Sequence, residues 1–176
     1  MPNWCFNLLT VTGEKRALAD FIRKANDNRE TWKSPYFRKR SPFSIERLMP
    51  TPEPLAGAVP PRDKAQAYEN KVIFGSEDWY HWRIKHWGTK CDVYADVTEQ
   101  ADEKIVYQFD SAWSPPREFF ETVSRMFPNL TFHIEYEEPM MGFAGEATYK
   151  NGFVEETYLD FVQDEDYQED EGRESA

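Results

Sequence analysis

Residues 104–137 read KIVYQFDSAWSPPREFFETVSRMFPNLTFHIEYE, and this stretch decides the fold. From Lys104 to Trp113 the pattern is that of a strand, whose alternation puts Ile105, Tyr107, Phe109 and Trp113 on one face. Ser114-Pro115-Pro116 begins a helix, because proline is tolerated where backbone N–H groups are unpaired. The buried stripe of that helix is Phe119, Phe120, Val123, Met126 and Phe127. Leu130 to Glu137 alternates again, so we predict strand, helix, strand.

The residues before this stretch predict a second set of a strand, a helix and a strand. Residues 3–12 are nearly continuous in apolar character, as in a central strand. Residues 14–26 place apolar side chains at helical spacing, which predicts an amphipathic helix. Lys90 to Thr98 predicts a further strand. The resulting order, β-α-β-β-α-β, is that of a ferredoxin-like sandwich in the α+β class.

Two segments are inserted between the first helix and the next strand. Residues 27–66 are rich in proline and are expected to be irregular, with Phe43, Ile45, Leu48 and Met49 holding part of them to the core. A Trp-rich helix is expected from Ser76, as N-cap, to Trp87, with Gly88 ending it. Its apolar face carries Trp79, Trp82, Ile84 and Trp87.

The C-terminal part predicts a hairpin and then a tail. Residues 146–149 and 153–159 flank Asn151-Gly152, a dipeptide that favours the type I′ turn of a hairpin. Beyond them, aromatic content falls and charge density rises. We therefore expect one domain over residues 1–162, with the hairpin extending its sheet, and an acidic, disordered tail over residues 163–176.

Charge is distributed unevenly along the chain, whose formal net charge is −11. Residues 155–176 contain 10 acidic residues against Arg173 alone, a charge of −9, which leaves −2 for the remaining residues. Within that near-neutral part, residues 23–47 hold 8 basic and 3 acidic residues. A basic loop and an acidic tail indicate electrostatic partners or contact between the two.

The sequence favours a cytoplasmic protein. The first residues lack the pattern of a signal peptide, and no apolar run has the length of a membrane span. Cys5 and Cys91 have no CxxC spacing and lie in apolar surroundings, as expected of reduced thiols.

Several short motifs resemble one known family, the phage- and plasmid-borne proteins with the YubB ferredoxin-like domain. The motifs are Met-Pro-Asn-Trp-Cys-Phe-Asn at 1–7, Leu-Met-Pro-Thr-Pro at 48–52, Trp79-Tyr80, Trp-Gly-Thr-Lys-Cys-Asp at 87–92, Ser-Ala-Trp-Ser-Pro-Pro at 111–116 and Gly-Phe-Ala-Gly at 142–145. Cys91 departs from the Trp expected at that position. The resemblance implies the fold and carriage on a mobile genetic element, and it assigns no catalytic residue.

The sequence predicts no enzyme, no metal site and no cofactor. His81 and His86 are five residues apart, a spacing that turns them away from a shared helix face. Cys91 with His86 is the one pair that could serve cysteine catalysis, which would need an exposed thiolate beside the histidine. An enzyme centred there is kept as a third possibility.

We expect instead a non-enzymatic accessory protein that binds a host or element-encoded protein, and thereby inhibits a nucleic-acid-handling or defence complex. Its contact residues would be acidic tail residues and the Trp-rich helix: Glu165, Asp166, Glu169, Asp170, Glu171, Trp79 and Trp82. The alternative is a module for single-stranded nucleic acid or RNA, in which a basic loop over residues 33–40 and sheet aromatics contact the ligand. Its residues would be Lys33, Arg38, Lys39, Arg40, Phe6 and Tyr107.

Overall fold

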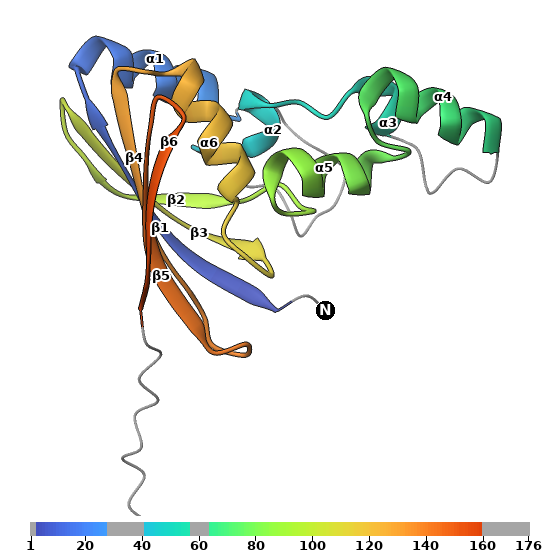
Figure 1. The fold of residues 1–176 in the computed structure, drawn as a ribbon. Helices are drawn as coiled ribbons and strands as arrows, with labels where there is room; N and C mark the ends of the chain where they lie inside the picture. Colours follow the sequence, from blue (N-terminus) through green and yellow to red (C-terminus); the bar gives the residue numbers. More distant parts are fainter. Residues whose placement is uncertain (1–2, 28–40, 57–63, 160–176) are drawn as a thin grey trace, which may run out of the picture.

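The computed structural model describes residues 3–27, 41–56 and 64–159, in which helices cover one face of a single sheet (Figure 1). The strands are β1 (Trp4–Gly13), β2 (Ala95–Gln100), β3 (Lys104–Ala112), β4 (Leu130–Glu138), β5 (Phe143–Lys150) and β6 (Phe153–Leu159). Helices α1 (Lys15–Ala25) and α6 (Arg117–Met126) pack on the same face of the sheet. In α6 the predicted stripe is buried at Phe119, Phe120 and Val123, and Phe127 is buried just after the helix. Met126, predicted in the same stripe, is 51% exposed because it lies on the outer side of the last turn.

The strand order is β2-β3-β1-β4-β5-β6, and every neighbouring pair is antiparallel. Together with α1 and α6, the first four strands of that order form the β-α-β-β-α-β arrangement with β1 and β3 adjacent at the centre. The predicted ferredoxin-like fold is therefore confirmed, and β5 and β6 extend the sheet beyond β4.

The core lies between the sheet and the two long helices. Alternation along β1 buries Cys5, Leu9 and Val11 on the helix side. The ring of Phe21 on α1 lies 5.3 Å from the ring of Phe132 on β4, edge to face. Fully burying an aromatic side chain of this size contributes about 1.5–3 kcal/mol. Phe43 is also fully buried, so this part of the proline-rich segment is held to the core as predicted.

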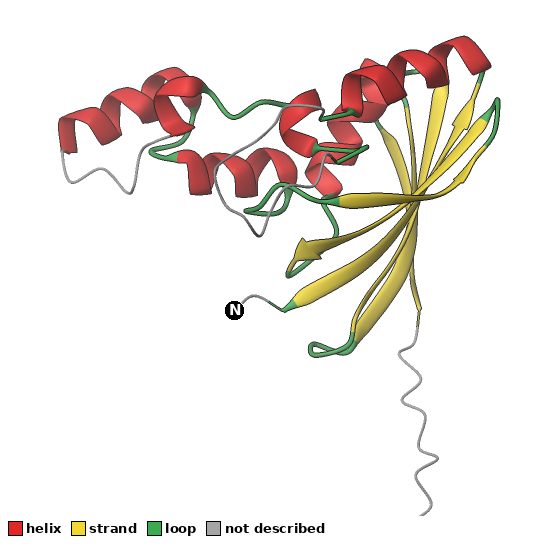
Figure 2. Cartoon of the chain, turned by 180° about the vertical axis from the view of Figure 1, so that it is seen from behind, coloured by secondary structure: helices red, strands yellow, loops and turns green. Residues whose placement is uncertain are grey.

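The inserted segment forms a helical arm that extends away from the sheet in both views (Figures 1 and 2). It contains α2 (Ile45–Leu48), α3 (Glu53–Ala56), α4 (Lys64–Phe74) and α5 (Trp79–Trp87). The expectation of irregular structure over residues 27–66 is wrong for α2, α3 and the first turn of α4. Short single-turn helices give no periodicity, and α4 lacks an apolar stripe because its one buried residue is the polar Asn70.

Three predicted boundaries need correction. The N-cap of α5 is Asp78, whose carboxylate accepts a bond from the His81 N–H at 2.9 Å, rather than Ser76. The strand predicted from Lys90 begins at Ala95, because the preceding residues connect the arm to the sheet. Trp113 does not continue the face of β3, since it lies beyond the strand with a φ of 72° and is 39% exposed. Gly88 ends α5 in the left-handed conformation, as predicted.

The C-terminal hairpin is confirmed at its predicted turn. Asn151 and Gly152 have φ angles of 49° and 81°, the positive values that a type I′ turn requires. β5 begins earlier than predicted, at Phe143, and β6 ends at Leu159. The proposed tail, residues 163–176, lies outside the described residues.

Candidate functional site

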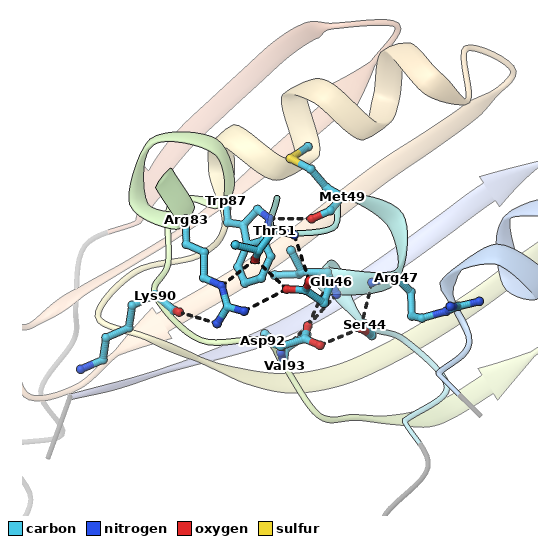
Figure 3. Close-up of polar contacts among 11 residues, drawn as sticks. Ser44, Glu46, Arg47, Met49, Thr51, Arg83, Trp87, Lys90, Asp92 and Val93 are labelled. Carbon is cyan, nitrogen blue, oxygen red and sulfur yellow. Dashed lines mark hydrogen bonds and ion pairs between the residues drawn. The ribbon is translucent and has the colours of Figure 1, made fainter. Parts of the chain in front are cut away.

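A polar cluster joins the helical arm to the sheet, and Asp92 is at its centre (Figure 3). Its carboxylate accepts bonds from Ser44 Oγ at 2.7 Å and from the Ile45 N–H at 2.7 Å, and more distantly from the Glu46 N–H at 3.3 Å. These groups open α2, so Asp92 caps a helix that is remote in sequence. Burial raises the pKa of Asp92, while the bonds from Ser44 and the backbone oppose that shift.

Arg83 of α5 completes this cluster (Figure 3). Its Nη2 donates to Glu46 Oε2 at 2.9 Å and its Nε donates to Thr51 Oγ1 at 2.9 Å. The guanidinium carbon lies 4.4 Å from the centre of the Trp87 ring, within the range of a cation–π interaction. The Arg83 guanidinium is thus held by hydrogen bonds to Glu46 and Thr51 and by the Trp87 ring.

A second set of bonds connects the C-terminal end of β3 to β1 and to the segment that follows α5. The Asn7 amide donates to the Cys5 carbonyl at 2.7 Å and to Ser111 Oγ at 2.9 Å. Thr89 Oγ1 accepts from the Ala112 N–H at 3.2 Å and donates to the Ala112 carbonyl at 3.3 Å. Asn7 and Thr89 are both buried, so these bonds replace hydration that burial removes.

These contacts show the structural role of the motifs that resemble the YubB family. Four of these motifs are far apart in the sequence but meet where the arm joins the sheet, through residues 3–7, 48–52, 87–92 and 111–116. The Trp87 indole, for example, donates to the Met49 carbonyl at 3.0 Å. Because their polar groups bond to one another, the motifs form a structural joint.

The sheet face opposite α1 and α6 is the one that no described helix covers (Figure 1). Alternation directs Phe6 and Leu8 of β1 toward it, beside Gln108 of β3 and Glu135 and Glu137 of β4. Phe6 is 46% exposed, although it lies in the central strand of the sheet. An exposed aromatic residue in that position is typical of a binding surface.

A hollow of about 410 Å³ lies on this face. Its lining residues are Phe6, Asn7, Leu8, Gln108, Glu135, Tyr136, Glu137, Ala144, Gly145 and Leu159. Gly145 lines the hollow with its backbone, since a Cβ there would point to the helix side of the sheet, where it would overlap the Tyr136 hydroxyl and the Thr157 carbonyl. The hollow therefore has a partly apolar floor and two glutamates on one side.

Carboxylates dominate the charge of this open face. Besides the two glutamates, Asp110 pairs across from Phe6, and Glu146 pairs across from Glu135. Partial burial raises the pKa of Asp110. Among the described residues, no group of three or more His, Cys, Asp or Glu side chains is arranged to hold a metal ion. The arrangement is suited to attract a cationic, partly apolar ligand.

The predicted aromatic contact residues are separated by the structure. Phe6 lies on the open face as the nucleic-acid alternative requires, whereas Tyr107 is fully buried on the helix side. The placement of Tyr107 as a base-stacking residue is therefore wrong. Trp82 is 8% exposed, with its ring stacked 4.3 Å from that of His86, so its assignment as an exposed anchor is also wrong. Trp79 is half-buried, with the Arg83 guanidinium against its ring.

The remaining predicted residues divide into two groups. Lys33, Arg38, Lys39 and Arg40 of the basic loop, and Glu165, Asp166, Glu169, Asp170 and Glu171 of the tail, lie outside the described residues. Cys91 is a half-buried free thiol, and His86 contacts the Trp82 carbonyl at 2.8 Å through Nδ1. Within residues 64–159, no hydrogen bond joins Cys91 to His86. None of the described helices has the length and apolar character to cross a membrane.

Sequence reasoning missed the hollow. The alternation of residues 130–137 does indicate that Glu135 faces away from the core, but it does not show which strands lie on either side. The lining of the hollow depends on the registers in which β5 pairs with β4 and β6 pairs with β5, because these bring Gly145 and Leu159 next to the glutamates of β4. The signal that could have found the hollow is the Asn-Gly turn, which fixes that register.

Comparisons with known proteins agree with this fold. The family described as the ferredoxin-like domain in Api92-like protein matches residues 93–175. The uncharacterised protein YubB of Escherichia coli (strain K12) is 27% identical over 92 residues, which are 51% of this chain and 63% of that relative, less than two thirds of its length. The crystal structure of the protein Api92 from Yersinia pseudotuberculosis superposes with a TM-score of 0.57 at 12% identity, over 90% of this chain and 98% of that one. This likeness shows the shared fold.

Proposed function

We propose, from the match of residues 93–175 to the family described as the ferredoxin-like domain in Api92-like protein, that the chain is a non-enzymatic module that binds a basic protein on the open face of its sheet. The partner is a host protein, or one encoded by the same phage or plasmid, in the cytoplasm of a bacterium. A subunit of a nucleic-acid-handling or defence complex has the required basic surface, and the bound module would inhibit it.

One observation carries this proposal: an exposed aromatic residue lies among carboxylates in the middle of the open sheet face. Phe6 is 46% exposed, and Asp110, Glu135 and Glu137 surround it across the neighbouring strands. An apolar anchor with a charged rim is the usual anatomy of a protein–protein contact. The acidic residues of 155–176 add long-range attraction for the same kind of partner.

The nucleic-acid alternative receives less support from the sheet. Carboxylates beside Phe6 repel phosphate groups, which are the main source of affinity in such complexes. Tyr107, the second aromatic residue that this alternative needs, is buried. The basic loop remains its only argument.

The experiment is affinity capture of the full chain from nuclease-treated bacterial lysate, compared between two variants of equal charge. Glu135→Lys with Glu137→Lys changes the hollow, while Glu69→Lys with Glu103→Lys makes the same charge change at exposed positions elsewhere. We expect one basic protein to be enriched by the wild type and the control variant and lost with the hollow variant. Equal capture by both variants would contradict the proposed surface.

A further inference from the structure

We propose that β6 is an open docking edge, which takes up an extended, basic segment of the partner as an additional antiparallel or parallel strand of the sheet. The inference rests on the proposed function for the basic character of the partner. It concerns the backbone of the outer strand, which is a different surface from the hollow.

β6 is the end strand in the order of the sheet, and its outer side is unpaired in the described part of the chain. Its pairing with β5 starts at Lys150 opposite Phe153, directly after the two-residue turn. In such a hairpin the first pair is hydrogen-bonded and alternate pairs follow. Val154, Glu156 and Tyr158 therefore direct their backbone N–H and C=O groups away from β5.

The two edge strands of the sheet differ in the features that prevent another strand from pairing with them. At the other end, the pairing of β2 shifts register between Val97 and Glu99, an irregularity of the kind that prevents strand addition. β6 pairs without any register shift and contains neither proline nor lysine. Such a regular edge is a template for another strand unless something covers it.

The side chains of β6 indicate the chemistry of the added strand. Phe153 and Leu159 are 78% and 51% exposed on the open face, and Tyr158 is 67% exposed on the helix side. Glu155 lies between the first two on the open face, opposite Thr148 of β5. In an added strand that alternates apolar and basic residues, the basic side chains on the open face would pair with Glu155, and the apolar side chains on the helix side would cover the ring of Tyr158.

Charge disfavours a second copy of this chain as the occupant. Antiparallel pairing of β6 with itself about Glu156 would place two Glu156 residues directly opposite each other, and like charges in that position are destabilising. The net charge of −11 opposes self-association further.

The test uses the full chain and a ten-residue peptide that alternates Val and Lys. Two analogues carry N-methyl groups on every Val amide or on every Lys amide. Because alternate amides of a strand face opposite sides, one analogue should lose binding and the other should retain it. On binding of the parent peptide, hydrogen exchange at the amides of Val154, Glu156 and Tyr158 should slow at least about tenfold.

Substitutions in the protein, rather than in the peptide, test the same edge. Val154→Pro removes an outward N–H and leaves the bonds to β5 in place, and it should bind about tenfold more weakly than Val154→Thr, which changes the same side chain and keeps the N–H. Equal affinities of the two variants, equal affinities of the two methylated peptides, or protection of these amides before peptide is added would overturn the inference. If the affinity for the peptide falls with Glu135→Lys and Glu137→Lys but not with Val154→Pro, the peptide binds in the hollow and not at the edge of β6. If the affinity falls with Val154→Pro but not with the two glutamate substitutions, the proposed binding at the edge stands and the proposed binding in the hollow is contradicted.

Discussion

The Arg83 guanidinium lies 2.9 Å from Glu46 Oε2, an ion pair between α5 and α2 that is largely shielded from solvent. We predict that Arg83→Met destabilises the fold by about 2–3 kcal/mol, because it leaves Glu46 without its charged partner in a partly desolvated site. Urea denaturation measures this loss. In a double-mutant cycle with Glu46→Gln, the two effects should be less than additive; full additivity would show that the pair is not coupled.

The pH dependence of stability should carry the signature of Asp92. Burial raises its pKa above the usual 3.8 in the folded protein. Its contribution to stability is therefore complete below that value and is lost as the pH rises through the raised pKa. Asp92→Asn has no such titration, so the stability difference between wild type and variant should narrow with rising pH over that window. A difference that widens would contradict the buried position of the carboxyl group.

The two cysteines should differ in reactivity. Burial raises the pKa of the Cys5 thiol to about 12, so almost none of it is thiolate at pH 8. In Cys91→Ser, we expect a thiol reagent such as dithionitrobenzoate to find no reactive group until the protein is denatured. Rapid reaction of the folded variant would show that Cys5 is accessible.

The hairpin turn should be sensitive to a single methyl group. Gly152 has a φ of 81°, and a Cβ there would also overlap the Arg125 side chain. Gly142 shares a positive φ of 68° but has open space around it. Gly142→Ala should cost about 1 kcal/mol from backbone strain alone, and Gly152→Ala should cost more. Equal thermal stability of the two variants would contradict the steric part of this account.

The acidic C-terminal residues should speed association with a basic partner. Truncation after Phe161 removes most of the acidic residues in 155–176. Once a partner is identified, we expect its association rate at low salt to fall by about tenfold, with a smaller change in dissociation, because distant charges act mainly by steering. Stopped-flow measurements over a salt series test this. A rate that is independent of both truncation and salt would exclude steering.

The sequence predicts the sheet and its two long helices because their periodicities are local. Alternation in β3 and β4 and the helical stripe that contains Phe119 lie within a few turns of chain, and the Asn-Gly turn does as well. The joint around Asp92 and Arg83 could not be predicted in this way, since its bonds connect residues 32–48 positions apart in sequence. α4 was missed because it is polar where it is buried, at Asn70.

The candidate site was predicted less well than the fold. Phe6 is exposed, as the nucleic-acid alternative requires, whereas Tyr107 lies on the opposite, buried face of the sheet. The alternation along β3 places Tyr107 on the same face as Ile105 and Phe109, and this apolar face is the one that the helices cover. The acidic surroundings of Phe6 come from β4, which only the pairing register brings alongside β1.

The most direct measurement is site-specific photocrosslinking in the bacterial host, with benzoylphenylalanine in place of Phe6 or, as a control, in place of Tyr68 on α4. Both positions are exposed, but Phe6 alone lines the hollow. The account predicts a crosslink to one basic protein from position 6, none to that protein from position 68, and loss of the product when Glu135→Lys and Glu137→Lys are added. A nuclease-sensitive product from position 6, or the same protein crosslinked from both positions, would contradict the central claim that the open sheet face binds a basic protein.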